Sequence, residues 1–252
     1  MTIPIAVQLY TVREALAQDF AGTMQKIADI GYVGVEVAAL PDHITPTAAK
    51  ETCDQLGLMI CSAHTPLPLG DEQNQVLDMV ATLGCSRIVN GYMPLELYQT
   101  IDQIKQLCDQ FNEANQVAQS QGYTLGLHNH WWEFEAVEGQ YPYQIWLERL
   151  DSSIFFEVDT YWVETAGLNA AEVIKALGQR APLLHLKDGP ADVPESNMVA
   201  VGDGRLDFSA IVNQADHAEW LIVELDRCDT DMLTAVEKSY HYLVTEGLAH
   251  GR

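Results

Sequence analysis

The chain has 252 residues, and 48% of them are hydrophobic, which suits one large α/β domain or two small ones. Its 36 acidic residues outnumber its 13 Lys and Arg residues, and the formal net charge is −23. A field of this sign repels phosphate backbones and anionic lipids, so we expect no nucleic-acid partner and no membrane partner. A phosphorylated small substrate stays open, because one local Lys or Arg would suffice to bind it.

Eight short apolar segments are predicted as strands, at residues 3–9, 33–37, 58–63, 87–90, 123–128, 154–158, 182–186 and 220–225. Helical spacing predicts helices after them, at residues 19–30, 47–56, 74–83, 96–121, 143–150, 170–177, 207–213 and 231–243. Several of these helices stop at a glycine that is typical of a helix end: Gly31, Gly57, Gly84, Gly122 and Gly178.

Strict alternation of strand and helix predicts a parallel sheet covered by helices. Eight such units favour closure into a (β/α)8 TIM barrel, as a single domain over residues 1–252. An open doubly wound sheet is the rival fold. It usually carries a glycine-rich turn after its first strand, but residues 8–13 contain no glycine.

The five cysteines are scattered without a CxxC pair, and we expect them to be small buried residues: Cys53, Cys61, Cys85, Cys108 and Cys228. Their odd number, together with an N-terminus that does not resemble a signal peptide, predicts a reducing, cytoplasmic location. No apolar run approaches the length of a membrane span.

Polar residues gather at the C-terminal ends of the predicted strands, whereas the N-terminal ends are apolar. The active site of a TIM barrel lies at that C-terminal edge. Carboxylates after strands also serve as helix N-caps, and this alternative explains some of them. The candidate residues at the strand ends, or just beyond them, are Gln8, Glu36, His64, Asn90, His128, His130, Asp159, His185, Lys187, Glu224 and Asp226.

Four consecutive strands, the fifth to the eighth, each end in a residue type that ligates metals: His128, Asp159, His185 and Glu224. Side chains two residues apart share a face of a strand, so Glu157 lies on the same face as Asp159. Two carboxylates and two imidazoles could hold one divalent ion, and this mixed set suits Mn²⁺, Zn²⁺, Co²⁺ or Mg²⁺. Each residue alone is as readily a structural hydrogen-bonding group or a cap, but the four together favour a metal site.

Two neighbouring features have alternative interpretations. Trp131, Trp132 and Trp162 follow the fifth and sixth strands, where they could stack on a sugar or could simply pack. The Gly-Asp-Gly segment at residues 202–204 could cradle an anion with its backbone amides, or it could be a turn followed by Asp207 as a helix cap.

Four motifs carry a family resemblance, and their sequences are HNHWWEF (128–134), LHLKD (184–188), GDGRLDF (202–208) and VELDR (223–227). On these the chain resembles, nearly end to end, the xylose isomerase-like TIM barrel superfamily, and within it the sugar phosphate isomerase/epimerase-like proteins with an HNHxxEF motif. The resemblance implies one divalent metal ion held by Asp159, His185 and Glu224. It also implies that Glu224 can act as a base and that His64 and Lys187 lie near the substrate.

The resemblance implies a metal-dependent isomerase or epimerase that acts on a keto-sugar, phosphorylated or not, through an enediolate. His128 stands where the epimerases carry a glutamate, and Trp162 where many carry a histidine. The second proton carrier therefore stays open between His130 and Glu133. We expect substrate contacts from His64, Glu36, Asn90, Trp162 and Asp226.

Two other functions stay open. Protonation of a β-hydroxyl by His130 or Glu133 would make the enzyme a dehydratase of an inosose or keto-sugar. The altered positions 128 and 162 would also suit a non-catalytic barrel that binds carbohydrate. Endonuclease chemistry on DNA fits less well, because the extra histidines of such sites are absent and the net charge opposes DNA. A sugar or polyol is the expected partner, and the sequence is compatible with a homodimer.

Overall fold

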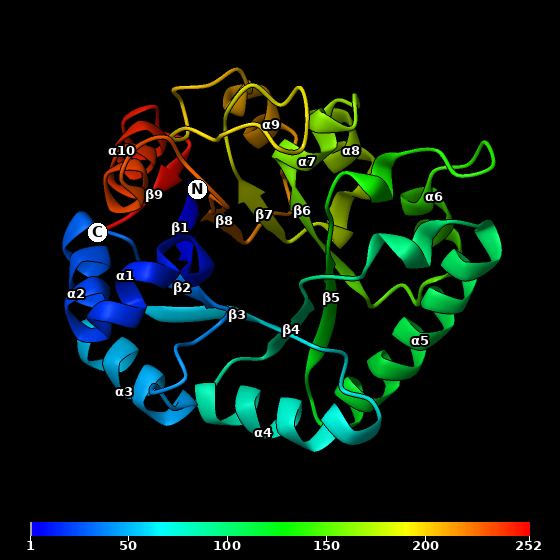
Figure 1. Ribbon diagram of the computed structural model, residues 1–252, viewed down its shortest axis with the longest axis horizontal. Coiled ribbons are helices and arrows are strands. Elements are labelled where there is room, and N and C mark those ends of the chain that lie inside the picture. The colour runs from blue at the N-terminus through cyan, green and yellow to red at the C-terminus, as the bar shows by residue number, and fades with distance from the viewer. Residues whose placement is uncertain (1) are drawn as a thin grey trace.

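The computed structural model describes residues 2–252, which form a closed barrel of parallel strands wrapped by helices (Figure 1). Each strand pairs with the next, and β8 pairs with β1, so the ring closes. The predicted (β/α)8 TIM barrel is therefore confirmed. The barrel strands are β1 (Ile3–Gln8), β2 (Gly34–Val37), β3 (Met59–Thr65), β4 (Arg87–Asn90), β5 (Thr124–His128), β6 (Phe155–Asp159), β7 (Leu183–Leu186) and β8 (Trp220–Val223).

Ten α-helices surround the barrel in the part of the chain that the structure describes. They are α1 (Arg13–Gln18), α2 (Phe20–Ile30), α3 (Pro46–Leu56), α4 (Gln73–Leu83), α5 (Ile101–Ser120), α6 (Pro142–Arg149), α7 (Thr160–Thr165), α8 (Ala170–Leu177), α9 (Phe208–Asn213) and α10 (Met232–Thr245). Short 3₁₀ turns add η1 (Leu9–Val12), η2 (Gly70–Glu72), η3 (Leu95–Tyr98), η4 (Trp132–Phe134) and η5 (Gly178–Arg180). Across residues 2–252 no helix has both the length and the apolar character that a bilayer crossing requires.

Besides the 3₁₀ turns, two α-helices and one strand were not predicted: α1, α7 and a short strand β9 (Ala249–His250) that pairs with β1 outside the ring. Helix α7 follows β6 without a loop, because Asp159 is both the last residue of the strand and the N-cap of the helix. The single helix predicted over 96–121 is divided into η3 and α5. The division falls where the Thr100 side chain accepts a hydrogen bond from the Gln103 backbone N–H and caps α5.

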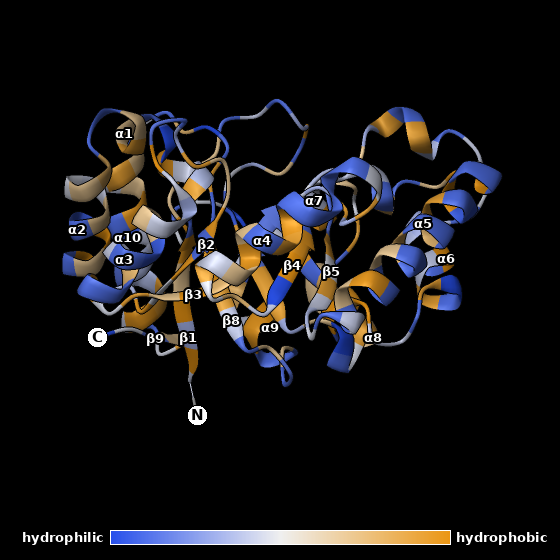
Figure 2. Ribbon diagram, turned by 90° about the horizontal axis from the view of Figure 1, so that it is seen from below, coloured by the Kyte–Doolittle hydropathy of each residue, from blue (hydrophilic) through white to orange (hydrophobic). Residues whose placement is uncertain are grey.

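The half of the barrel interior that lies toward the N-terminal ends of the strands, here called the lower half, is apolar. Its side chains pack together as one cluster: Ala6, Cys61, Val89, Phe155, Leu183, Trp220 and Ile222. Gly126 leaves room for this packing, since a Cβ there would lie 2.1 Å from the Phe155 ring. In Figure 2 the strands carry mostly the hydrophobic colour, while the helices around them mix both colours. Four of the five cysteines are buried, as predicted, and Cys228 is half-buried.

Candidate active site

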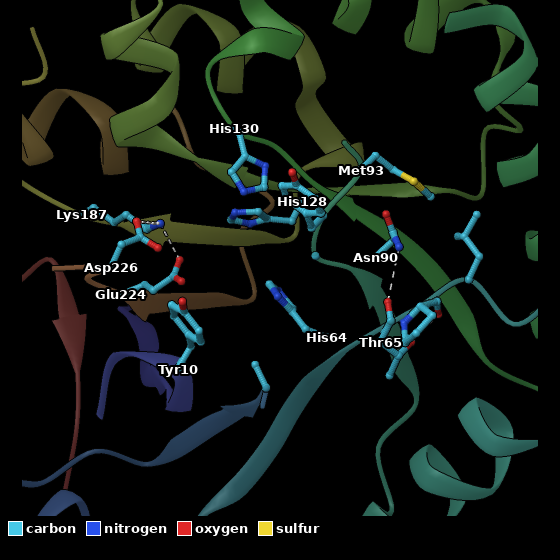
Figure 3. A pocket seen from close by; sticks show the side chains of 15 residues that line it. Tyr10, His64, Thr65, Asn90, Met93, His128, His130, Lys187, Glu224 and Asp226 are labelled. Atoms are coloured by element: carbon cyan, nitrogen blue, oxygen red, sulfur yellow. Dashed lines mark hydrogen bonds and ion pairs between the residues drawn. The ribbon is translucent and has the colours of Figure 1, made fainter. Parts of the chain in front are cut away.

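A cavity of about 660 Å³ opens at the C-terminal ends of the barrel strands, the edge at which the sequence predicts the site (Figure 3). Residues from most of the strand ends contribute to its wall. They are Tyr10, Ala38, His64, Thr65, Pro66, Leu67, Asn90, Gly91, Tyr92, Met93, His128, His130, Lys187, Glu224 and Asp226.

The four predicted metal ligands converge beside this cavity. One nitrogen or oxygen from each of His128, Asp159, His185 and Glu224 lies within 4.8 Å of the others, and all four residues are buried. His185 Nδ1 lies 2.7 Å from Glu224 Oε2, and His128 Nε2 lies 3.8 Å from Asp159 Oδ2. These residues therefore form an N₂O₂ donor set of a kind that divalent transition metals accept.

The two carboxylate oxygens of Asp159 make different contacts. Oδ1 accepts hydrogen bonds from the backbone N–H groups of Tyr161 and Trp162, at 3.0 and 3.1 Å, and so caps α7. Oδ2 is buried and makes no hydrogen bond within residues 2–252, although Lys187 Nζ lies 3.0 Å away as an ion pair. Burial raises the pKa of Asp159 to about 6, against the opposing effect of Lys187. A buried carboxylate oxygen whose one charged neighbour is Lys187, and which faces ligand atoms of His128, His185 and Glu224, fits a bound cation.

Lys187 sits among three carboxylates. Its Nζ lies 3.0 Å from Asp159 Oδ2, 2.9 Å from Glu224 Oε2 and 2.8 Å from Asp226 Oδ2, and it lies 5.1 Å from the centre of the Trp162 ring. Burial alone would lower the pKa of Lys187, but the three carboxylates raise it well above its ordinary value. The ammonium therefore stays charged, and this part of the site stabilises positive charge.

Two buried glutamates, Glu36 and Glu157, contact the histidines on the side away from the donor set. Glu36 Oε2 lies 2.7 Å from His185 Nε2, while Glu157 Oε2 lies 3.2 Å from both His185 Nε2 and His128 Nδ1. His64 Nε2 lies 2.5 Å from the same Glu157 oxygen. These carboxylates leave His185 Nδ1 and His128 Nε2 directed at the donor set, which is the outer-carboxylate arrangement common around metal-binding histidines.

Glu157 is the main residue that our sequence analysis did not propose for the site. The sequence feature that could have identified it is its position two residues before Asp159, which places both side chains on the inner face of β6. With His64, His128 and His185 it forms a second group of possible ligands that also lie within 4.8 Å of one another. Burial alone would raise the pKa of Glu157, but His185 and His64 hold it well below its ordinary value.

The remaining predicted residues divide into two groups. His64, Asn90, His130, Lys187 and Asp226 line the cavity as expected, whereas Glu36, Glu133 and Trp162 are buried behind its wall. Glu36 contacts the predicted ligand His185, and Trp162 lies beneath the Lys187 ammonium. These three residues contact His185, Lys187 and His130 and do not line the cavity.

Glu133 supports His130. Its Oε2 accepts a hydrogen bond of 2.8 Å from the His130 backbone N–H, and burial raises the pKa of Glu133 to about 8. The His130 ring stacks on Trp132 at 4.3 Å, and its Nδ1 is buried without a partner among the described residues. Burial, helped by His128 and Lys187, lowers the pKa of His130 well below its ordinary value, so this cavity imidazole is neutral.

The three tryptophans after β5 and β6 pack against one another and against His130. Trp132 and Trp162 are buried, Trp131 is half-buried, and none of the three is among the residues described as lining the cavity. The packing interpretation therefore holds. The aromatic side chains at the cavity are Tyr10 and Tyr92 instead.

The Gly-Asp-Gly segment is a turn followed by a cap. The Asp188 carboxylate accepts hydrogen bonds from the backbone N–H groups of Gly202, Gly204 and Leu206, at 2.9, 3.0 and 3.2 Å. A Cβ at position 204 would lie 2.1 Å from Asp188 Oδ1, which explains the glycine there. Asp207 caps α9 by accepting from the Ala210 N–H at 2.9 Å. These amides are occupied by the chain's own carboxylate, so they do not form an open anion cradle.

Comparison with known proteins gives a consistent result. A sugar phosphate isomerase/epimerase from Parabacteroides distasonis has 25% sequence identity and a TM-score of 0.84, over 99% of this chain and 96% of its own. An L-ribulose 3-epimerase has 17% identity and a TM-score of 0.72, over 98% of this chain and 94% of its own.

The IolI protein, solved with a bound zinc atom, has 14% identity and a TM-score of 0.71, over 98% of this chain and 99% of its own. No functionally curated protein sequence matches. The sequence profile of the xylose isomerase-like TIM barrel family matches residues 24–243. The chain therefore belongs to the xylose isomerase-like TIM barrel family.

Proposed function

We propose that the protein is a divalent-metal-dependent isomerase or epimerase of a keto-sugar, acting through an enediolate. The observation that carries this proposal is the convergence of His128, Asp159, His185 and Glu224 next to a cavity at the strand ends. Relatives with the same fold are named as a sugar phosphate isomerase/epimerase and an L-ribulose 3-epimerase, which supports the same reaction class.

His128, Asp159, His185 and Glu224 would hold the ion. When bound, a divalent ion supplies Lewis-acid polarisation of a substrate carbonyl, which acidifies the neighbouring C–H. The mixed donor set suits Mn²⁺, Zn²⁺, Co²⁺ or Mg²⁺. The zinc atom in the IolI protein makes Zn²⁺ a sensible first choice for reconstitution.

Glu224 is the proposed base. Burial alone would raise the pKa of Glu224, but Lys187 and His185 hold it well below its ordinary value, so the carboxylate is ionised. His185 Nδ1 and Lys187 Nζ fix its Oε2, and the residue lines the cavity where a substrate C–H would lie. The charged Lys187 ammonium stabilises negative charge that develops on the substrate oxygens.

His130 is the proposed second proton carrier. It lines the cavity as a neutral imidazole, whereas Glu133 lies behind it and is bonded to its backbone. Return of the proton to the neighbouring carbon gives an isomer, and return to the opposite face of the same carbon gives an epimer. Because the His130 imidazole is neutral, it can deliver a proton only after it has taken one from solvent or from a substrate hydroxyl. Delivery of that proton to a β-hydroxyl, with loss of water, is the second candidate reaction.

Exchange of the substrate α-proton with solvent deuterium tests the proposal, measured by NMR on a panel of ketoses and keto-inositols with each metal in turn. We expect exchange that depends on added metal and is lost in Glu224→Gln. Loss of water from the product would identify the dehydratase. Tight ligand binding without exchange would identify a binding protein, and a complete lack of exchange and turnover with every metal would overturn the enzymatic proposal.

A further inference from the structure

Three buried polar side chains lie just beyond the C-terminal ends of barrel strands and bond the backbone of the neighbouring strand or of the residues that follow it. They are Asn129 after β5, Thr160 after β6 and Thr11 after β1, here called the rim side chains. None of the three is more than 4% exposed. Each bonds a backbone group at a proposed metal ligand or directly beside one, and none has a part in the proposed chemistry.

Asn129 bonds both backbone groups of Asp159. Its Oδ1 accepts a hydrogen bond from the Asp159 N–H at 2.9 Å, and its Nδ2 donates to the C=O groups of Asp159 and His130, both at 3.2 Å. The paired register of β5 with β6 ends at His128 opposite Glu157, and Asp159 lies two residues further on. The Asn129 amide therefore takes the place of the next backbone pair of the ladder.

Thr160 continues the same pattern between β6 and β7. Its Oγ1 donates to the His185 C=O at 3.0 Å. The register of these strands ends at Asp159 opposite His185, and Thr160 is already the first residue of α7, where the backbone leaves the sheet. The hydroxyl therefore supplies a donor at the point where the ladder ends.

Thr11 connects β1 to the end of β8. Its Oγ1 accepts a hydrogen bond of 3.0 Å from the N–H of Leu225, the residue directly after Glu224. The paired register of β1 with β8 ends earlier, at Val7 opposite Val223. Because Thr11 is buried, this N–H would lose its partner if the hydroxyl were removed, which is costly inside a protein. Thr11 thus fixes the peptide group that follows Glu224.

We infer that the rim side chains are positioning residues, which set the spacing of the metal ligands by fixing the backbone that carries Asp159, His185 and Glu224. This inference rests on the proposed metal-dependent function. A metal ion accepts its donors only within a narrow range of positions, and the backbone beyond a strand end is no longer held by the sheet. A bond to the backbone of a ligand residue then orients the ligand as a bond to its side chain would.

Asn129→Ala removes both bonds to Asp159, and Asn115→Ala is its matched control. Asn115 is equally buried, in α5, and its Nδ2 donates to Ser153 Oγ at 2.9 Å and to Asp151 Oδ2 at 3.3 Å. We expect both variants of the full-length protein to lose thermal stability, but only Asn129→Ala to lose affinity for Co²⁺, by about 10- to 100-fold in competition with a chelator. The visible absorption of bound Co²⁺, which reports its coordination geometry, should change in Asn129→Ala alone.

A second set of variants tests Thr160. Thr160→Val removes the hydroxyl, and Thr160→Ser keeps it. The control is Thr165→Val, also in α7, which removes a hydroxyl that donates to the Tyr161 C=O at 2.8 Å. We expect weaker binding and altered absorption of Co²⁺ in Thr160→Val, recovery of both in Thr160→Ser, and no change in the control. This set decides the inference if Asn129→Ala does not fold.

The inference and the proposed function fail in different ways, because none of these measurements uses a substrate. If Asn129→Ala and Thr160→Val bind Co²⁺ as tightly as their controls and with the same absorption, the rim side chains only stabilise the fold and the inference is wrong. If both variants lose affinity but no substrate exchanges its α-proton in the wild type, the proposed function alone fails. A wild type that binds no Co²⁺ overturns the metal site and the inference together.

Discussion

The two halves of the barrel interior use the same strands but have opposite chemistry. In β6, Phe155 packs in the apolar lower half, while Glu157 and Asp159 enter the upper half as buried carboxylates. In β7, Leu183 lies below His185, and Lys187 follows directly after the strand. Alternation along a strand therefore decides which side chains point inward, and position along the strand decides whether they serve packing or chemistry.

The difference has an energetic meaning. Buried apolar side chains in the lower half stabilise the fold, whereas buried ionisable groups in the upper half cost stability unless they are paired. Burial raises the pKa of Glu36 to about 7 and that of Asp159 to about 6, so both carboxylates are held where their charge is disfavoured. Substitutions in the two halves should therefore separate function from stability.

The largest effect is expected from the upper half. Asp159→Asn and Glu224→Gln keep the shape of the side chains but remove a proposed ligand, and Glu224→Gln also removes the base. We expect α-proton exchange to fall by about 10²–10⁴. Each variant should lose less unfolding free energy than Phe155→Ala, because Lys187 keeps two of its three carboxylate partners. Asp216→Asn makes the same change of charge at an exposed position outside the site and should keep full exchange. Exchange above a tenth of the wild-type rate in both site variants would contradict their roles.

The lower half should give the opposite result. Phe155→Ala removes a buried ring from the apolar cluster and should cost about 3–5 kcal/mol of unfolding free energy, measured in urea. Phe155→Leu, which leaves a smaller void, should cost less. Under native conditions both variants should still bind the metal that the wild type binds. A loss below about 1 kcal/mol for the alanine variant would mean that this cluster does not support the barrel.

Glu157→Gln tests whether a buried carboxylate orients the histidines of the metal site. The Glu157 carboxylate contacts His64, His128 and His185, and we expect it to orient the imidazoles of His128 and His185. Loss of its charge should weaken metal binding about 10- to 100-fold, measured by competition with a chelator. The number of bound ions should not change. An unchanged affinity would limit Glu157 to a packing role, and a lost ion would make it a ligand.

The smallest effect concerns pH. Burial raises the pKa of Glu133 to about 8 in the folded protein, above its ordinary value near 4.5. Between those values the folded state binds a proton that the unfolded state has lost, so stability falls as the pH rises from about 5 to 8. Glu133→Gln keeps an acceptor for the His130 N–H. The unfolding free energy of this variant should fall less steeply with pH than that of the wild type, by up to about 1.4 kcal/mol per pH unit. Parallel stability curves for the variant and the wild type would contradict this.

The barrel and its active edge follow from local sequence patterns. Apolar strands that alternate with glycine-terminated helices predict the fold, and parallel strands bring His128, Asp159, His185 and Glu224 to one edge. Asp159 illustrates the limit of this reasoning. The ligand and the helix cap were competing interpretations, yet one oxygen caps α7 and the other faces the donor set. A residue type at a strand end does not reveal how its two oxygens are used.

What the sequence could not predict depends on the curvature of the closed sheet. Glu36 lies behind His185 partly because the pairing of β2 with β3 shifts by one residue, which brings Ser62 to 2.5 Å from its carboxylate. His64 meets Glu157 across 93 residues of chain. Trp162 lies beside the Lys187 ammonium because α7 begins directly after Asp159. None of these contacts has a signature in local spacing.

Metal content tests the central claim most directly. The wild type would be reconstituted with Mn²⁺, Zn²⁺ or Co²⁺, freed of excess ion and measured by elemental analysis beside Asp159→Ala and Glu224→Ala. We predict about one divalent ion per chain in the wild type and none in either variant, since both carboxylates belong to one site. A wild type that stays metal-free, or variants that both keep the ion, would contradict the proposed metal site.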